Sequence, residues 1–338
     1  MKTNRLSSDL ATQTMRAVAQ TGYGAPETSL ELTRLPIPTV TADQVLVEVA
    51  ASSLNALEWH YLTGTPYFLR FENGFRSPKR LVPGADVAGT VVAVGDEVTG
   101  FRIGDEVFGE IDSGGFAEYA VAPTQALAHR SPELPLEEHA TLGVAALTAL
   151  QGLRDWGAMQ PGDRVLVNGA SGGVGTFAVQ IAKALGAGHV TAVCSTGNVE
   201  TAYTLGADRV LDYTSEDLAG IGDRFDVFFD NAGSLSISQS RRLLTSDGTL
   251  VMITGKKGRW FRPADRMVAG MIRSKFWSQG FASRVARASG EDGAALADMV
   301  TEGRVRPAID RRFTLDDAVA ALAYQGEGHA RGKSLVLP

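Results

Sequence analysis

Val165-Leu166-Val167-Asn168-Gly169-Ala170-Ser171-Gly172-Gly173-Val174-Gly175 is the stretch that decides the fold. An apolar run with β-branched residues leads into a glycine-rich turn, and apolar residues then recur at helical spacing. That helical face carries Val174, Ala178, Ile181 and Leu185. A strand, a tight turn and a helix in this order are typical of the first βα turn of a dinucleotide-binding domain.

The turn has the residues that a pyrophosphate site needs. Small residues permit the tight turn, the approach of the phosphates and close packing of helix on strand, and they are Ala170, Gly172 and Gly175. Free amides at a helix N-terminus attract the phosphates. The predicted phosphate-binding residues are therefore Ala170, Ser171, Gly172, Gly173, Val174 and Gly175.

The end of the second predicted strand bears on the choice of cofactor. An acidic residue at this place would hold the ribose hydroxyls of NAD, but residues 194–198 read Cys-Ser-Thr-Gly-Asn. The hydroxyls of Ser195 and Thr196 tolerate a 2′-phosphate that a carboxylate would repel. The sequence favours NADPH, with NADH possible.

The chain pattern predicts two domains and a tail. Short apolar runs alternate with helical periods over 139–278, which predicts a doubly wound parallel α/β sheet of the Rossmann type. The predicted strands are Arg164–Val167, His189–Val193, Arg209–Asp212, Val227–Phe229 and Thr249–Ile253. Residues 15–138 read as mostly β and 279–338 are expected to join them, while 1–14 are expected to form a flexible tail.

Composition excludes several classes of protein. The net charge of −6 over 338 residues gives no reason to expect a nucleic acid partner. The longest apolar stretch, near 142–150, is shorter than the roughly 20 residues of a membrane span. The N-terminus lacks a secretory signal, so a cytoplasmic location is expected. One cysteine, Cys194, and five histidines without ligand spacing predict no metal site.

Several segments together resemble the medium-chain dehydrogenases/reductases, in particular the zinc-independent quinone oxidoreductase, or zeta-crystallin-like, branch. The segments that carry this resemblance are 55–64, 83–89, 114–119, 169–175, 205–208 and 329–333. Zinc-dependent relatives have Gly-His-Glu where this chain has Gly84-Ala85-Asp86, so the resemblance implies no zinc.

The resemblance also implies a GroES-like, mostly β catalytic domain made from both chain ends, a Rossmann domain between them, and a homodimer. The cofactor contacts that it implies are Thr148, Ser195, Tyr213, Asn231, Ala232, Thr254, Gly255 and Lys333. Relatives often carry Arg or Lys within the loop that reads Ser195-Thr196-Gly197-Asn198 here. The absence of that cation from this chain weakens the expected selectivity for NADPH.

The predicted catalytic residues are Asn55, His60 and Tyr61, because the family has an Asn-Pro-x-Asp/Glu motif there, followed by an aromatic hydroxyl. Ala56 replaces the proline, and either His60 or Tyr61 could donate a proton or hydrogen bond. Structural roles for all three stay open. The neighbouring acids Glu58 and Asp86 could form a polar pair or a proton relay, or lie in solvent.

The predicted function is a metal-free NAD(P)H-dependent oxidoreductase that transfers hydride to a small apolar quinone or α,β-unsaturated carbonyl, as an enoyl reductase does. One alternative is a metal-free carbonyl or alcohol oxidoreductase on the same scaffold, because fold alone does not separate the two. The other is a non-catalytic sensor or structural protein that binds NADPH.

Overall fold

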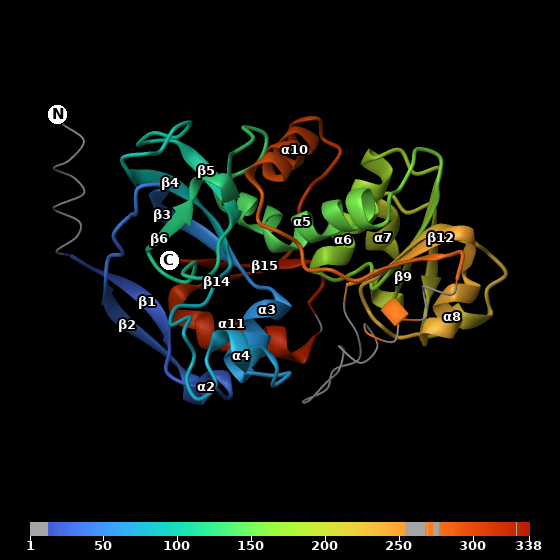
Figure 1. The fold of residues 1–338 in the computed structure, drawn as a ribbon, viewed down its shortest axis with the longest axis horizontal. Helices are drawn as coiled ribbons and strands as arrows, with labels where there is room; N and C mark the ends of the chain where they lie inside the picture. Colours follow the sequence, from blue (N-terminus) through green and yellow to red (C-terminus); the bar gives the residue numbers. More distant parts are fainter. Residues whose placement is uncertain (1–12, 254–267, 269, 273–276, 329) are drawn as a thin grey trace. The chain divides into compact units, whose positions relative to one another are not determined.

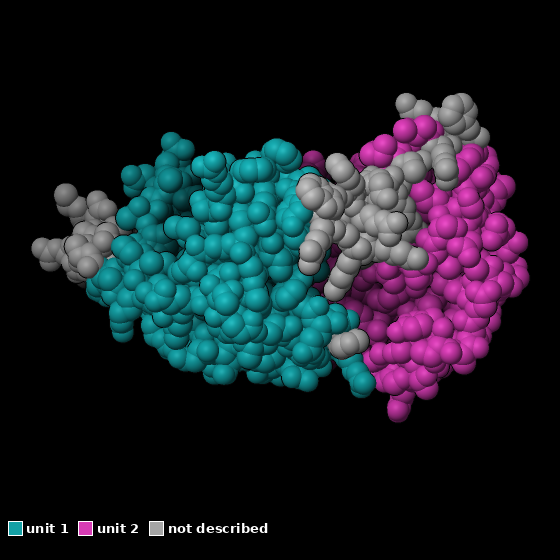
Figure 2. Space-filling view, turned by 90° about the horizontal axis from the view of Figure 1, so that it is seen from below, with its two compact units in different colours: residues 1–144, 288–302, 309–338 teal, residues 145–287, 303–308 magenta. Residues whose placement is uncertain are grey.

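The computed structural model describes residues 13–253, 268, 270–272, 277–328 and 330–338. The chain forms two compact units, coloured separately in Figure 2. Unit 1 comprises Met1–Val144, Ala288–Glu302 and Ile309–Pro338, and unit 2 comprises Ala145–Arg287 and Gly303–Ala308. The boundaries lie a few residues later than the sequence predicts. The sequence also did not predict that the segment Gly303–Ala308, here termed the return segment, belongs to unit 2.

Unit 2 contains a six-stranded parallel sheet in the order β10-β9-β8-β11-β12-β13. Its strands are β8 (Arg164–Asn168), β9 (His189–Cys194), β10 (Arg209–Asp212), β11 (Phe225–Asp230), β12 (Leu244–Met252) and β13 (Gly280–Ala282). Five of these are the predicted strands, with ends shifted by a few residues. The order reverses beside β8, which is where a doubly wound sheet binds its ligand.

In unit 2, helix α5 (Val144–Gln151) precedes β8, and three helices follow strands of the sheet (Figure 1). Helix α6 (Gly173–Ala184) follows β8, α7 (Val199–Thr204) follows β9 and α8 (Ile237–Arg242) follows β11. Apolar side chains from successive strands, including Leu166, Val193 and Phe228, form one buried cluster. The return segment is held by Gln180, whose amide bonds the backbone N–H and carbonyl of Arg306 at 2.9 Å each.

Unit 1 contains a seven-stranded sheet in the order β14-β15-β3-β4-β5-β7, with β6 also paired to β3. These strands are β3 (Gln44–Ser53), β4 (Asp86–Val94), β5 (Glu106–Glu110), β6 (Tyr119–Pro123), β7 (Leu127–His129), β14 (Ile309–Thr314) and β15 (Lys333–Leu337). Alternate residues of β3, namely Val45, Val47 and Val49, enter one buried cluster with Val87 and Val91 of β4. A separate hairpin pairs β1 (Thr14–Gln20) with β2 (Leu30–Pro36).

Both ends of the chain build unit 1, as Figure 1 shows by the blue and red segments that meet there. Residues Leu335 and Val336 of β15 pair with Ser53 and Ser52 of β3. The helices of this unit are α2 (Pro26–Ser29), α3 (Ala56–Thr63), α4 (Leu69–Asn73), α10 (Gly290–Thr301) and α11 (Ala318–Glu327). Most of the expected tail lies outside the described residues, and β1 begins at Thr14.

Across the described part of the chain, the helices are too short or too polar to cross a membrane.

Candidate active site

The glycine-rich turn lies between β8 and α6, at the carboxyl end of the sheet. Gly169 adopts a φ of +81°, and the amides of Gly169 and Ala170 donate to the Val193 carbonyl at 3.1 and 3.0 Å. Helix α6 starts after Gly172, which makes no side-chain capping hydrogen bond. The first-turn amides therefore face the turn without a side-chain cap, as an anion site at a helix N-terminus requires.

Two glycines of this turn are required for different reasons. A Cβ on Gly175 would lie 2.0 Å from the Gly169 carbonyl oxygen, so this residue must be glycine for helix and strand to pack. A Cβ on Gly172 would meet no protein atom closer than 3.8 Å. Protein packing leaves the space over Gly172 open, which fits the approach of phosphates to the backbone.

Polar groups at the ends of β8 and β11 close the turn from the other side. The Asn168 amide donates to Asp230 Oδ1 at 2.9 Å, and the same oxygen accepts the Gly233 N–H at 2.8 Å. This fixes Asn231 and Ala232 against the turn: a Cβ on Gly169 would lie 3.3 Å from both. The structure thus brings the predicted contacts Asn231 and Ala232 next to the phosphate turn.

The ends of β9 and β10 carry the predicted adenosine contacts. Tyr213 is exposed, and its N–H donates to the Cys194 carbonyl at 3.1 Å, so Tyr213 lies beside Ser195. The Thr196 hydroxyl donates to the Asp212 carboxylate at 2.6 Å. The Ser195 hydroxyl accepts the Asn198 side-chain amide at 2.9 Å.

The remaining predicted cofactor contacts have varied positions. Thr148 is buried in α5 of unit 2. Thr254 and Gly255 lie outside the described residues. Lys333 begins β15 of unit 1 with its side chain buried, so its cofactor role stays a prediction.

The predicted catalytic segment forms α3 of unit 1, with Asn55 as its N-cap. The Glu58 carboxylate accepts the Asn55 N–H at 2.7 Å and the Ala85 N–H at 2.9 Å, which joins the helix start to the loop before β4. The Asn55 amide group donates to Asp86 Oδ2 at 2.9 Å, and its oxygen accepts from Lys333. Both ends of the Asn55 side chain are thus engaged within the protein.

Four ionisable side chains form what we term the buried ion cluster: Glu58, Asp86 and Lys333, which are buried, and Glu110, which is half-buried. The Lys333 ammonium donates to the Leu54 carbonyl at 2.9 Å and lies 3.5 Å from Asp86 Oδ2. Asp86 also accepts from the Ser53 hydroxyl and, at 2.7 Å, from the Val144 N–H. The buried Asp86 side chain thus accepts hydrogen bonds from Ser53, Asn55 and Val144 and pairs with Lys333, as a buried charge requires.

The protonation of this cluster follows from its burial. Burial and the Asp86 charge raise the pKa of Glu58 to about 7 and that of Glu110 to about 8. Burial lowers the pKa of Lys333, and the nearby carboxylates oppose that shift. At pH values well below 7 both glutamic acid side chains are therefore neutral.

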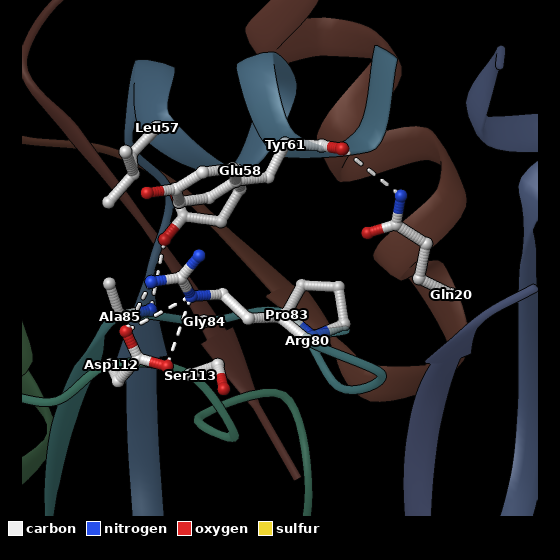
Figure 3. Close-up of a pocket in the computed structure, with 10 residues that line it drawn as sticks. All are labelled: Gln20, Leu57, Glu58, Tyr61, Arg80, Pro83, Gly84, Ala85, Asp112 and Ser113. Atoms are coloured by element: carbon white, nitrogen blue, oxygen red, sulfur yellow. Dashed lines mark hydrogen bonds and ion pairs between the residues drawn. The ribbon is translucent and has the colours of Figure 1, made fainter. Parts of the chain in front are cut away.

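Tyr61 and His60 have different surroundings on α3. His60 Nδ1 lies 2.8 Å from the Thr65 carbonyl, a local contact across the end of the helix. Tyr61 instead lines a small pocket, drawn in Figure 3, with the Arg80 guanidinium 4.5 Å from the centre of its ring. Burial raises the pKa of Tyr61, so its hydroxyl keeps its proton at neutral pH. The pocket residues are Gln20, Leu57, Glu58, Tyr61, Arg80, Pro83, Gly84, Ala85, Asp112 and Ser113.

Sequence reasoning missed two acids. Glu110 was not singled out, although the antiparallel pairing of β4 with β5 places it opposite Asp86. Asp212 was also missed, because it follows β9 by a whole helix yet lies beside the end of that strand. No group of three or more His, Cys, Asp or Glu side chains that could hold a metal ion occurs within the described ranges.

Comparison with family models of known proteins gives two matches along the chain. Residues 41–133 match the family "Alcohol dehydrogenase GroES-like domain", and residues 205–336 match "Zinc-binding dehydrogenase". The chain is 34% identical to "Quinone-oxidoreductase QR1, chloroplastic" of Triphysaria versicolor, over 97% of this chain and 100% of that one. It is 30% identical to "NADPH-dependent alkenal/one oxidoreductase, chloroplastic" of Arabidopsis thaliana, over 96% and 80%.

Among solved structures, the quinone oxidoreductase from Coxiella burnetii superposes with a TM-score of 0.84 at 28% identity, over 96% of this chain and 100% of that one. The fold is thus shared over nearly the whole length of both chains. The chain belongs to the quinone oxidoreductase branch of the medium-chain dehydrogenase/reductase superfamily, and it is an oxidoreductase.

Proposed function

We propose that this enzyme uses NADPH, with NADH as a second donor, to reduce a small apolar quinone or α,β-unsaturated carbonyl without a metal. The observation that carries the proposal is the glycine-rich turn. A Cβ on Gly175 would collide with the Gly169 carbonyl oxygen, whereas no protein atom fills the space over Gly172. The amides of the first turn of α6 have no side-chain cap beside that space. This is the arrangement that a bound pyrophosphate needs.

When bound, the cofactor would supply a hydride, which would leave negative charge on the oxygen of the acceptor. The chain must provide a hydrogen-bond donor for that oxygen and a source for one proton. Tyr61 fits this role better than His60, because Tyr61 lines a pocket with Arg80 and its hydroxyl makes only a long hydrogen bond, 3.4 Å to Glu72 Oε1. His60 Nδ1 lies 2.8 Å from the Thr65 carbonyl. We assign Asn55 a positioning role, since its amide is bound by Asp86 and Lys333.

The donor groups present support chemistry without zinc. Ala85 stands where the zinc-dependent relatives have a histidine, and the Asp86 carboxylate is occupied by Ser53, Asn55, Val144 and Lys333. A zinc ion would need to displace that ammonium and still lack nitrogen or sulfur ligands. The cytoplasmic location remains a prediction from the sequence, and the homodimer remains an implication of the family resemblance.

The test is oxidation of NADPH and NADH at 340 nm by purified, EDTA-treated protein, with a quinone, an enone and a simple ketone as acceptors. We expect turnover of the quinone or enone that EDTA does not reduce. Reduction of the simple ketone alone would refute the proposed substrate class. Tight NADPH binding without any turnover would show instead a sensor or structural protein.

A further inference from the structure

The most informative feature outside the proposed chemistry is the carboxylate of Asp212, at the end of β10. In a dinucleotide-binding sheet, the strand next to the glycine-turn strand ends at the adenosine ribose, and its last residues read the 2′ position. Here that strand is β9, followed by Ser195 and Thr196. Asp212 pairs with Cys194 of β9, so its side chain lies at the same edge of the sheet.

The hydroxyl expected to receive a 2′-phosphate is already bound. Thr196 Oγ1 donates to Asp212 Oδ2 at 2.6 Å. Asp212 Oδ1 accepts from the Thr214 N–H at 2.9 Å and the Thr214 hydroxyl at 2.7 Å. Thr196 can turn toward a phosphate only by leaving this carboxylate, so a 2′-phosphate must displace a hydrogen bond that an uncharged 2′-hydroxyl can leave in place.

The charge of Asp212 acts in the same direction. Its hydrogen bonds, first that from Thr196, lower the pKa of the Asp212 carboxyl, which is therefore ionised at neutral pH. A 2′-phosphate beside it would be a second anion, and residues 195–198 contain no Lys or Arg to offset the repulsion. The 2′-hydroxyl of NADH carries no such penalty.

We propose that Asp212 is a specificity-determining residue that lowers the preference for NADPH and lets NADH serve as a donor. The inference rests on the proposed function, because it assumes that the adenosine end of a nicotinamide cofactor lies at this edge. Asp212 contributes no atom to the reaction. Its effect is confined to the choice between the two cofactors.

The experiment compares wild type with Asp212→Asn by isothermal titration with 2′,5′-ADP and with 5′-AMP. We expect Asp212→Asn to bind 2′,5′-ADP roughly tenfold more tightly at low salt, with the gain shrinking at high salt because exposed charges are screened. Binding of 5′-AMP should stay within about twofold of wild type, since the lost interaction concerns only the extra phosphate. The ratio of kcat/KM for NADPH over NADH should rise by the same factor.

The matched control is Glu216→Gln, which removes one exposed charge four residues away, from a side chain that accepts the Asp212 N–H at 3.2 Å. An equal gain in this control would reduce the effect to net charge and overturn the inference. Unchanged affinity of Asp212→Asn for 2′,5′-ADP would overturn it too. Asp212→Ser removes the charge with a different shape and should move the ratio in the same direction.

Failure of the proposed function gives a different pattern. If neither probe binds wild type nor Asp212→Asn, this edge is no adenosine site and both proposals fall. If 5′-AMP binds equally to both proteins and 2′,5′-ADP gains nothing, only the assignment of Asp212 is refuted.

Discussion

Replacing Lys333 by methionine should destabilise the protein far more than replacing an exposed lysine. The substitution keeps most of the apolar stem and removes the ammonium that lies 3.5 Å from Asp86. Asp86 then stays buried with three donors but no counter-ion, and the Leu54 carbonyl and the Asn55 side-chain oxygen each lose a donor. Lys333→Met therefore tests whether the ammonium holds this part of unit 1 together.

The magnitude follows from these losses. Removing one partner of a buried ion pair costs about 3–5 kcal/mol, because the other charge is left without compensation. We therefore expect a loss of about 4 kcal/mol. For a unit of this size, that loss lowers the melting temperature by about 10 °C.

The assay is thermal unfolding, followed by calorimetry and circular dichroism. Lys79→Met, the same change at an exposed site in unit 1, should shift the melting temperature by less than about 2 °C. Adding Asp86→Asn to Lys333→Met should recover about 2 kcal/mol, since the orphaned charge is gone.

A different result would refute this reasoning. If Lys333→Met has the melting temperature of wild type but binds NADPH more weakly, then Lys333 is the cofactor contact that the family resemblance implied. Its ammonium would not be the counter-ion on which Asp86 depends.

Three further expectations concern the cluster, the turn and the pocket. Burial raises the pKa of Glu110 to about 8, so this side chain takes up a proton on folding, and the free energy of unfolding falls as pH rises from about 5 to 9. Glu110→Gln should lessen that fall by about 2–4 kcal/mol, measured by urea unfolding across this pH range. An equal fall in wild type and variant would contradict the prediction. Gly172→Ala should weaken NADPH binding at least about tenfold with little change in melting temperature, whereas Gly175→Ala should lose about 2 kcal/mol or more of stability, measured by urea unfolding. Tyr61→Phe should lower kcat for the quinone about 10- to 100-fold and leave NADPH affinity unchanged by fluorescence titration; an unchanged kcat would remove Tyr61 from the chemistry.

The parallel sheet was predictable because its strands are buried, apolar and separated by helical periods. The strands that escaped prediction lack that signal. β13 has only three residues, and β14, which reads Ile-Asp-Arg-Arg-Phe-Thr, is half exposed at the edge of its sheet. An edge strand with charged side chains does not alternate clearly between apolar and polar.

The phosphate turn was predictable for the same local reason, but the acids around it were not. Glu58 and Asp86 were weighed as a pair or as solvated residues, and the structure shows both buried. Their burial depends on β15 meeting β3, a contact between distant parts of the chain. Asp212 likewise reaches Thr196 only through the pairing of β10 with β9. Local patterns carry no information about such neighbours.

The shared construction of unit 1 from both chain ends has a consequence for biosynthesis. Lys333 is translated 247 residues after Asp86, and every strand of the unit 2 sheet emerges in the interval. Domains generally fold in order as they leave the ribosome, but here β3 must wait for β15, with an unpaired edge and an uncompensated carboxylate. We expect unit 1, whose synthesis begins first, to complete its folding last. Nascent chains halted before residue 333 should need chaperones to protect the unpaired edge of β3.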